Sequence, residues 1–157
     1  MTRWLSADQQ RIWRDWLTTS ELLDHILNSE LQASHGLSLG DYEILVRLSE
    51  SPKRRIRMSE LAEKVLISRS RLSHQIDRMQ EAGLVDRKIC DDDRRGQFAV
   101  LTDHGWKALV SAAHVHVSGV RNHFVDILTD AEYAALGRAV KKLAAYLDDG
   151  NETSKAK

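Results

Sequence analysis

The sequence predicts a mainly α-helical protein with one small β-hairpin near its middle. Apolar residues recur every three or four positions in the first and last parts of the chain, as in amphipathic helices. Between them, "LVDRKIC" alternates apolar and polar side chains and "FAVL" follows, which indicates two strands. With 157 residues and 42% hydrophobic residues, the chain suits one domain with helical extensions.

The first two helices are predicted from their start signals. Ser6 with Gln9, and Ser38 with Asp41, fit the capping-box pattern in which a side chain and a backbone N–H pair reciprocally. The first helix is expected to end near residues 34–36, "SHG". The second ends at "SPKRR", which leads into a very short extended piece, "RIRM".

Two short helices joined by a tight turn follow. They are "SELAEKV", with a small residue at Ala62, and "SRSRLSHQIDRMQEAG", with Ser68 as N-cap and Gly83 just past the C-terminus. This arrangement suits a helix-turn-helix, although the turn "LIS" lacks the glycine often found there. Leu72, Ile76 and Met79 are expected to face the core.

The rest of the chain is predicted as the hairpin and two long helices. Thr102 caps a helix over about 103–128, and a last helix covers about 130–148. The expected organisation is an N-terminal helix (1–36), a helix-turn-helix core (37–101) whose second helix covers about 69–82 and whose hairpin covers about 84–101, C-terminal helices (102–148) and a disordered tail (149–157).

The charge distribution points to a polyanionic partner, although the formal net charge is zero. Residues 53–95 hold twelve Lys and Arg against eight Asp and Glu, whereas the rest holds eleven against fifteen. A basic middle between acidic ends suits nucleic acid binding. A solvated surface with chance clustering is the alternative.

Other classes of function have little support in the sequence. There is no nucleophile elbow, Gly-rich phosphate loop or plausible triad, so we do not expect an enzyme or a cofactor. His114 and His116 are two apart and would face different directions on a helix, so no metal is expected. Acids beside Cys90 would raise its pKa, which disfavours redox sensing. Without a signal or membrane-spanning segment, a cytoplasmic protein is expected.

The helix at about 69–82 carries the residues suited to reading DNA, so we expect it to be the recognition helix of a DNA-binding core (37–101). Arginine can grip guanine O6 and N7, while serine and histidine can reach base edges or phosphates. The candidate DNA-binding residues on this helix are Arg69, Ser70, Arg71, Ser73, His74 and Arg78. A polar solvated face, which every surface helix has, is the alternative.

The hairpin turn "CDDDRRGQFAVLT" concentrates opposite charges at the tip of a two-stranded wing. A wing arginine can enter the narrow, electronegative minor groove. Arg94 and Arg95 would be the inserted or phosphate-gripping charges, and Asp93 would hold an arginine extended before DNA arrives. The alternative is a surface salt bridge that only stabilises the turn.

Residues 59–109 resemble the MarR-type winged helix-turn-helix transcriptional regulators. The most specific elements are "SRSRLSHQIDRM", "GLV", "DRRG" and "LTDHG". The resemblance implies a homodimer whose first and last helices form the interface and whose recognition helices enter successive major grooves. By position, Ser70, Arg71, Ser73 and His74 look like the base- and phosphate-contacting residues, and Arg94, with Asp93, like the wing arginine.

The resemblance also implies a small aromatic or lipophilic effector between the dimerisation helices and the DNA-binding lobe. The residues that would line such a pocket are Trp13, Trp16, His35, Tyr42 and Trp106. A tryptophan at helical spacing is more often part of a core or an interface.

The apolar residues at the two ends of the chain independently favour a dimer. The final stripe, Tyr133, Leu136, Val140, Leu143 and Leu147, has no obvious partner in the middle segment. An intrachain helix bundle is the alternative. The predicted function is a homodimeric, ligand-responsive repressor on a palindromic DNA operator. The competing hypothesis is a winged-helix module that binds only protein.

Overall fold

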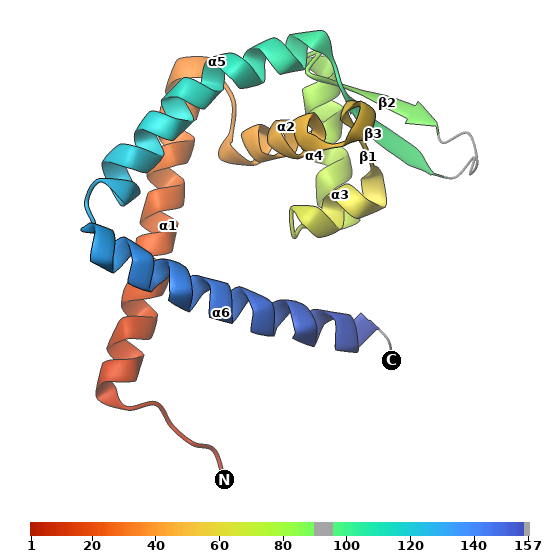
Figure 1. Cartoon of the computed structure of the whole chain (residues 1–157). Coiled ribbons are helices and arrows are strands. Elements are labelled where there is room, and N and C mark those ends of the chain that lie inside the picture. Colours follow the sequence, from red (N-terminus) through yellow and green to blue (C-terminus); the bar gives the residue numbers. More distant parts are fainter. Residues whose placement is uncertain (90–95, 156–157) are drawn as a thin grey trace. The chain divides into compact units, whose positions relative to one another are not determined.

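The computed structural model describes residues 1–89 and 96–155, with side chains up to residue 148. The chain divides into two compact units, residues 1–119 and 120–157. Figure 1 shows the order of the helices and strands along the chain. Among the described residues, no helix combines the length and apolarity needed to cross a membrane.

The first two helices begin where their capping patterns predict. Helix α1 (Ala7–His35) follows Ser6, whose side chain accepts from the Gln9 N–H, and α2 (Leu39–Glu50) follows Ser38 in the same way. Helix α1 ends at Gly36, whose φ of 66° is left-handed and favours glycine. Both capping boxes are therefore confirmed.

The middle of unit 1 is a helix-turn-helix beside a three-stranded antiparallel sheet. A 3₁₀ turn (Pro52–Arg54) precedes β1 (Arg55–Arg57), and the helix-turn-helix comprises α3 (Met58–Lys64) and α4 (Arg69–Glu81). Strands β2 (Val85–Ile89) and β3 (Gln97–Leu101) form the predicted hairpin. The short extended piece also joins the sheet, because β1 pairs with β3 in the order β1-β3-β2.

The core of unit 1 lies between the helices and the inner face of this sheet. The three α4 residues predicted to face inward, Leu72, Ile76 and Met79, are buried. They pack in one cluster with buried residues of other elements, including Leu31, Ile44, Leu45, Leu48, Ile56, Leu61, Val85 and Ala99. This packing fixes one side of α4, and therefore determines which side chains it presents to solvent.

Helix α5 (Asp103–Val120) starts at the predicted cap, where Thr102 Oγ1 accepts a 2.9 Å hydrogen bond from the Gly105 N–H. A Cβ on Gly105 would overlap the Leu84 carbonyl oxygen, so only glycine allows this close approach. The start of α5 is thus anchored to the turn after α4.

The last two helices differ in detail from their predicted bounds. The helix predicted over about 103–128 is α-helical to Val120 and continues as a π-helical segment (Arg121–Val125). Helix α6 (Asp130–Lys155) begins after Thr129, which caps it together with Glu132. It continues beyond the predicted boundary at residue 148, and no proline interrupts residues 130–155.

Candidate nucleic-acid interface

The recognition helix α4 presents a polar, basic face opposite its buried stripe. Ser68 caps the helix by accepting from the Arg71 N–H at 3.3 Å. The side chains that the core leaves outside include the predicted DNA-binding residues: Arg69, Ser70, Arg71, His74 and Arg78 are exposed, and Ser73 is half-buried. Five of the six predicted residues on this helix are therefore accessible to a partner.

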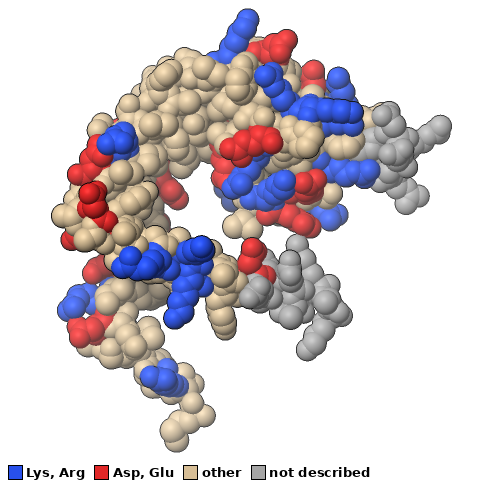
Figure 2. Space-filling view, in the orientation of Figure 1, with Lys and Arg blue, Asp and Glu red and all other residues tan. Residues whose placement is uncertain are grey.

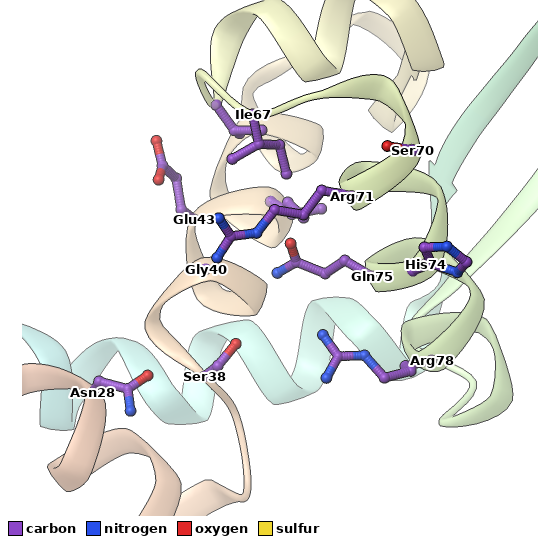
Figure 3. Close-up of a pocket in the computed structure, with 12 residues that line it drawn as sticks. Asn28, Ser38, Gly40, Glu43, Ile67, Ser70, Arg71, His74, Gln75 and Arg78 are labelled. Atoms are coloured by element: carbon purple, nitrogen blue, oxygen red, sulfur yellow. The ribbon is translucent and has the colours of Figure 1, made fainter. Parts of the chain in front are cut away.

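A groove of about 700 Å³ runs between α4 and the N-terminal end of α2 (Figure 3). Arg71, His74 and Arg78 line its α4 side, and Arg71 and Arg78 extend from α4 towards α2. The apolar part of the groove wall is formed by Ile44, Val65 and Ile67. The groove also contains Glu43, whose carboxylate is paired with Arg47 at 3.3 Å. Basic side chains therefore dominate the α4 side of the groove, which suits phosphate groups.

Hydrogen bonds between helices hold this groove in shape. Gln75 on α4 donates from Nε2 to Asp41 Oδ1 at 2.9 Å, and Asp41 Oδ2 accepts from the Ser38 N–H. A Cβ on Gly40 would lie 3.0 Å from Gln75 Nε2, so glycine permits the close approach of α2 to α4. The α1 residue Asn28 accepts from the first N–H of α2 at 2.9 Å. No pattern in the sequence singles out these residues.

Arg87 on β2 is the other functional residue that the sequence analysis missed. Its guanidinium lies 2.9 Å from the Ser73 carbonyl oxygen and 2.7 Å from Asp77 Oδ1, both on α4. It also donates to Gln97 Oε1 on β3 at 3.0 Å. One side chain therefore joins the recognition helix to both wing strands. Because Ser73 Oγ also accepts from Arg87, that hydroxyl already has a protein partner.

Comparison with known proteins assigns this architecture to a family. A model of the MarR family matches residues 35–96. The structure of AbsC, a MarR family transcriptional regulator from Streptomyces coelicolor, is 49% identical and superposes with a TM-score of 0.87, covering 94% of this chain and 99% of AbsC. The chain belongs to the MarR family of transcriptional regulators.

Two further relatives bear on function. Sco3205 from Streptomyces coelicolor, solved in complex with DNA, is 42% identical, covers 92% of this chain and 90% of its own, and has a TM-score of 0.87. The transcriptional repressor YetL of Bacillus subtilis (strain 168) is 25% identical over 92% of this chain and 87% of its own length. These relatives are regulators, so the expectation that the chain is not an enzyme is confirmed.

The predicted wing-tip residues of this MarR-family chain lie outside the described residues. They are Asp93, Arg94 and Arg95, together with Cys90. The strands that lead to and from them are described: β2 ends at Ile89 and β3 begins at Gln97. The structure therefore establishes the base of the wing.

The five residues predicted to bind an effector lie in different surroundings within unit 1. Trp13 and Trp16 are exposed on α1, and Trp106 on α5 lies beneath Arg54, 4.5 Å from its guanidinium. Tyr42 is buried and its ring centroid lies 4.5 Å from that of His116. His35 Nε2 lies 3.0 Å from Ser111 Oγ. None of the five lines the groove beside α4 or a smaller cavity near Gly36.

Burial affects the two rings of the Tyr42–His116 pair in opposite directions. It raises the pKa of the Tyr42 hydroxyl and lowers the pKa of His116, because a charge on either ring would lose solvation. The described residues contain no group of three His, Cys, Asp or Glu side chains placed to hold a metal ion.

Proposed function

We propose that this MarR-family regulator binds a palindromic operator in double-stranded DNA as a homodimer and represses transcription by occluding a promoter. The observation that carries the proposal is the basic, solvent-exposed face of α4, with Arg71, His74 and Arg78 along an open groove. In this proposal α4 enters the major groove, where Arg71 and His74 contact bases or phosphates.

Several polar residues of α4 would contribute to DNA binding. Arg69 and Ser70 lie in the first turn of α4, where N–H groups face outward and favour phosphate. Arg78 lies two turns further along the groove and is proposed to grip a phosphate. The hydroxyl of Ser73 already accepts a hydrogen bond from Arg87, so Ser73 would help to orient α4 as well as contact DNA.

The wing would contact the adjacent minor groove. We propose that Arg94 enters this groove, that Asp93 orients it and that Arg95 grips the backbone. This supposes that the hairpin β2–β3 projects its tip towards DNA. An Arg94→Ala variant should lose most of its DNA affinity while remaining dimeric, as measured by anisotropy titration at matched salt. Equal affinity of variant and parent would reject the role.

Exposed apolar side chains outside the DNA-binding core support the proposed homodimer. The exposed apolar side chains include Trp4, which precedes α1, and Ile12, Trp13 and Trp16 in the first half of α1. Helix α6 exposes Tyr133, Val140, Leu143, Tyr146 and Leu147. Apolar surface on this scale is typical of an interface with another chain. A second copy of α1 and α6 would bury it in an isologous contact.

Selection of binding sites from random DNA duplexes at moderate salt tests the proposal. An enriched inverted repeat with half-sites about one helical turn apart would establish a dimeric reader and supply the operator. Salt-sensitive retention without enrichment would contradict sequence-specific reading. No retention at all would favour the protein-interaction module. The same selection, repeated with small aromatic acids present, tests release by an effector. The proposed binding residues for it remain Trp13, Trp16, His35, Tyr42 and Trp106.

A further inference from the structure

The wing sheet has two faces of different chemistry, set by its strand register. On the inner face Ile56, Ala99 and Arg87 lie in one row across β1, β3 and β2, and Ile56 and Ala99 are buried. The rows on either side point outward, because neighbouring residues of a strand face opposite ways. The outward rows are Arg55–Val100–Asp86 and Arg57–Phe98–Lys88.

This outer sheet face, defined as Arg55, Arg57, Lys88 and Phe98, arranges cations around one aromatic ring. The guanidinium carbon of Arg55 lies 4.6 Å from the centroid of Phe98, and that of Arg57 lies 5.5 Å from it. Stacking on the ring of Phe98 holds the guanidinium of Arg55 in place and leaves the N–H groups at its edges able to donate to an anion. Less side-chain entropy is then lost when an anion binds.

The second row lies next to the proposed minor-groove contact. Lys88 is followed by one residue, Ile89, before the segment 90–95 begins. Charges separated by less than the Debye length, about 8 Å at physiological ionic strength, still attract each other appreciably. Phosphates that border the groove entered by the wing would therefore attract these cations.

We propose that the outer sheet face binds backbone phosphates of the same duplex, just outside the base pairs contacted by the wing. The inference rests on the proposed function and extends it to a DNA segment that neither α4 nor the wing tip reads. Phosphate contacts of this kind add affinity and fix orientation without adding sequence preference. Lys and Arg side chains gather over the sheet region of unit 1 in Figure 2, in keeping with a basic surface.

Asp86 belongs to the same outward row as Arg55 but carries a negative charge. Its replacement therefore tests whether the charge of this face affects DNA binding. A carboxylate on a phosphate-binding face repels the DNA backbone. Removing its charge should therefore strengthen binding, whereas removing the charge of Arg55 or Lys88 should weaken it. The two changes act on the same face, so opposite outcomes would separate electrostatic contact with DNA from an effect on folding.

The experiment compares two duplexes that carry the same operator. One is trimmed at the outer edge of the base pairs protected by the wing, and the other extends one helical turn further on each side. Affinity is measured by fluorescence anisotropy over a range of salt concentrations. The proteins are the parent, the double variant Arg55→Gln/Lys88→Gln, the variant Asp86→Asn, and Lys107→Gln as a control of equal charge type on α5.

On the extended duplex, the double variant should lose about two units of salt slope, because each phosphate contact contributes about 0.9. Its affinity should fall by roughly tenfold or more, while Asp86→Asn should bind more tightly. On the trimmed duplex the double variant and parent should bind alike, and Lys107→Gln should match the parent on both. Single Lys88→Gln, on a different strand from Arg55, should show about half of the change in slope.

Two results would overturn the inference. One is a double variant that equals the parent on the extended duplex, as expected if this face binds an acidic protein instead. The other is an equal loss on both duplexes, which would place the contact inside the operator. A parent that binds neither duplex would instead overturn the proposed function, and this inference with it.

Discussion

The guanidinium of Arg87 on β2 donates a 2.7 Å hydrogen bond to Oδ1 of Asp77 on α4. Asp77 projects from the exposed face of the recognition helix, where an uncompensated carboxylate would repel a phosphate backbone. Arg87 neutralises it, and the same guanidinium reaches Ser73 on α4 and Gln97 on β3. The pair thus sets both the charge of α4 and its orientation relative to the wing.

Replacing Arg87 by methionine should lower both stability and DNA affinity. The side chain is only 20% exposed, and hydrogen bonds to charged groups contribute about 1.5–3 kcal/mol, so the free energy of unfolding should fall by about that amount. DNA affinity should also fall, because the carboxylate of Asp77, no longer paired with Arg87, would repel the phosphate backbone. Urea unfolding and anisotropy titration measure the two effects.

A second substitution separates charge from geometry. Adding Asp77→Asn to Arg87→Met removes the repulsive carboxylate but leaves the recognition helix detached from the wing strands. Affinity should recover in part, while stability should not. Arg87→Lys keeps the charge without the planar fork and should lie between the parent and Arg87→Met in both measurements. If Asp77→Asn restores no affinity, the electrostatic role of Arg87 is wrong.

Leu66, in the turn between α3 and α4, has a left-handed backbone that disfavours leucine. Its φ is 55°, so its backbone is strained, and its side chain is 84% exposed, so burial does not offset the strain. The left-handed conformation costs an L-residue roughly 1–2 kcal/mol. Leu66→Gly should therefore raise the free energy of unfolding, by about 0.5–1 kcal/mol after the greater entropy of unfolded glycine is included.

The converse substitution provides the control for Leu66. Gly83 follows α4 with a φ of 70°, so Gly83→Ala should destabilise the protein by about 1–2 kcal/mol. Urea unfolding of both variants under one set of conditions gives the comparison. A Leu66→Gly variant less stable than the parent would show that the exposed leucine packs against something that offsets the strain.

Local features of the chain could be predicted because local chemistry decides them. The caps at Ser6, Ser38 and Thr102 depend on side chains that reach backbone groups only three residues away. The turn at Gly83 depends on one residue's freedom to adopt a positive φ. In each case the sequence pattern and the structural contact lie in one short segment.

Features that depend on distant segments could not be predicted in the same way. The pairing of β1 with β3 joins Ile56 to Ala99, and nothing local in "RIRM" indicates that partner. Arg87 fits the polar alternation of its strand, so its sequence context gives no sign of its contact with Asp77. For the site, helical periodicity identified the exposed face of α4, whereas the groove beside it required the position of α2.

The half-buried ring of His116 should make stability depend on pH. Burial lowers its pKa below the ordinary value of 6.5, whereas unfolding restores that value. Below about pH 6.5 the unfolded chain therefore binds a proton that the folded chain does not, and the free energy of unfolding falls as pH drops. The loss is complete once the pH lies below the lowered pKa of the folded state.

Replacing His116 by phenylalanine tests this assignment. Phenylalanine keeps a ring against Tyr42 but cannot take up a proton. The variant should lose part of the parent's decline in stability below about pH 6.5, measured by urea unfolding at a series of pH values. His25→Phe, on the exposed side of α1, serves as a control for removing a histidine. Parallel pH profiles for His116→Phe and the parent would contradict the assignment.

The apolar stripe of α6 gives a direct test of the proposed dimer. Leu143 is 60% exposed in the single chain, and in a homodimer it would be buried. A glutamate there would lose solvation on association, so Leu143→Glu should weaken the dimer by roughly 100-fold, or about 3 kcal/mol. Lys141→Glu, on the opposite side of the same helix, introduces an acid without touching the stripe and should remain dimeric.

Sedimentation velocity at micromolar protein concentration distinguishes these two variants. The Leu143→Glu variant should sediment as a monomer with the parent's helical circular dichroism. It should also bind operator DNA weakly, since a monomer engages only one half-site and loses the effective concentration that couples two. A Leu143→Glu variant that remains dimeric would place the interface elsewhere. A parent that is itself monomeric would require the exposed stripes of α1 and α6 to bind a different protein.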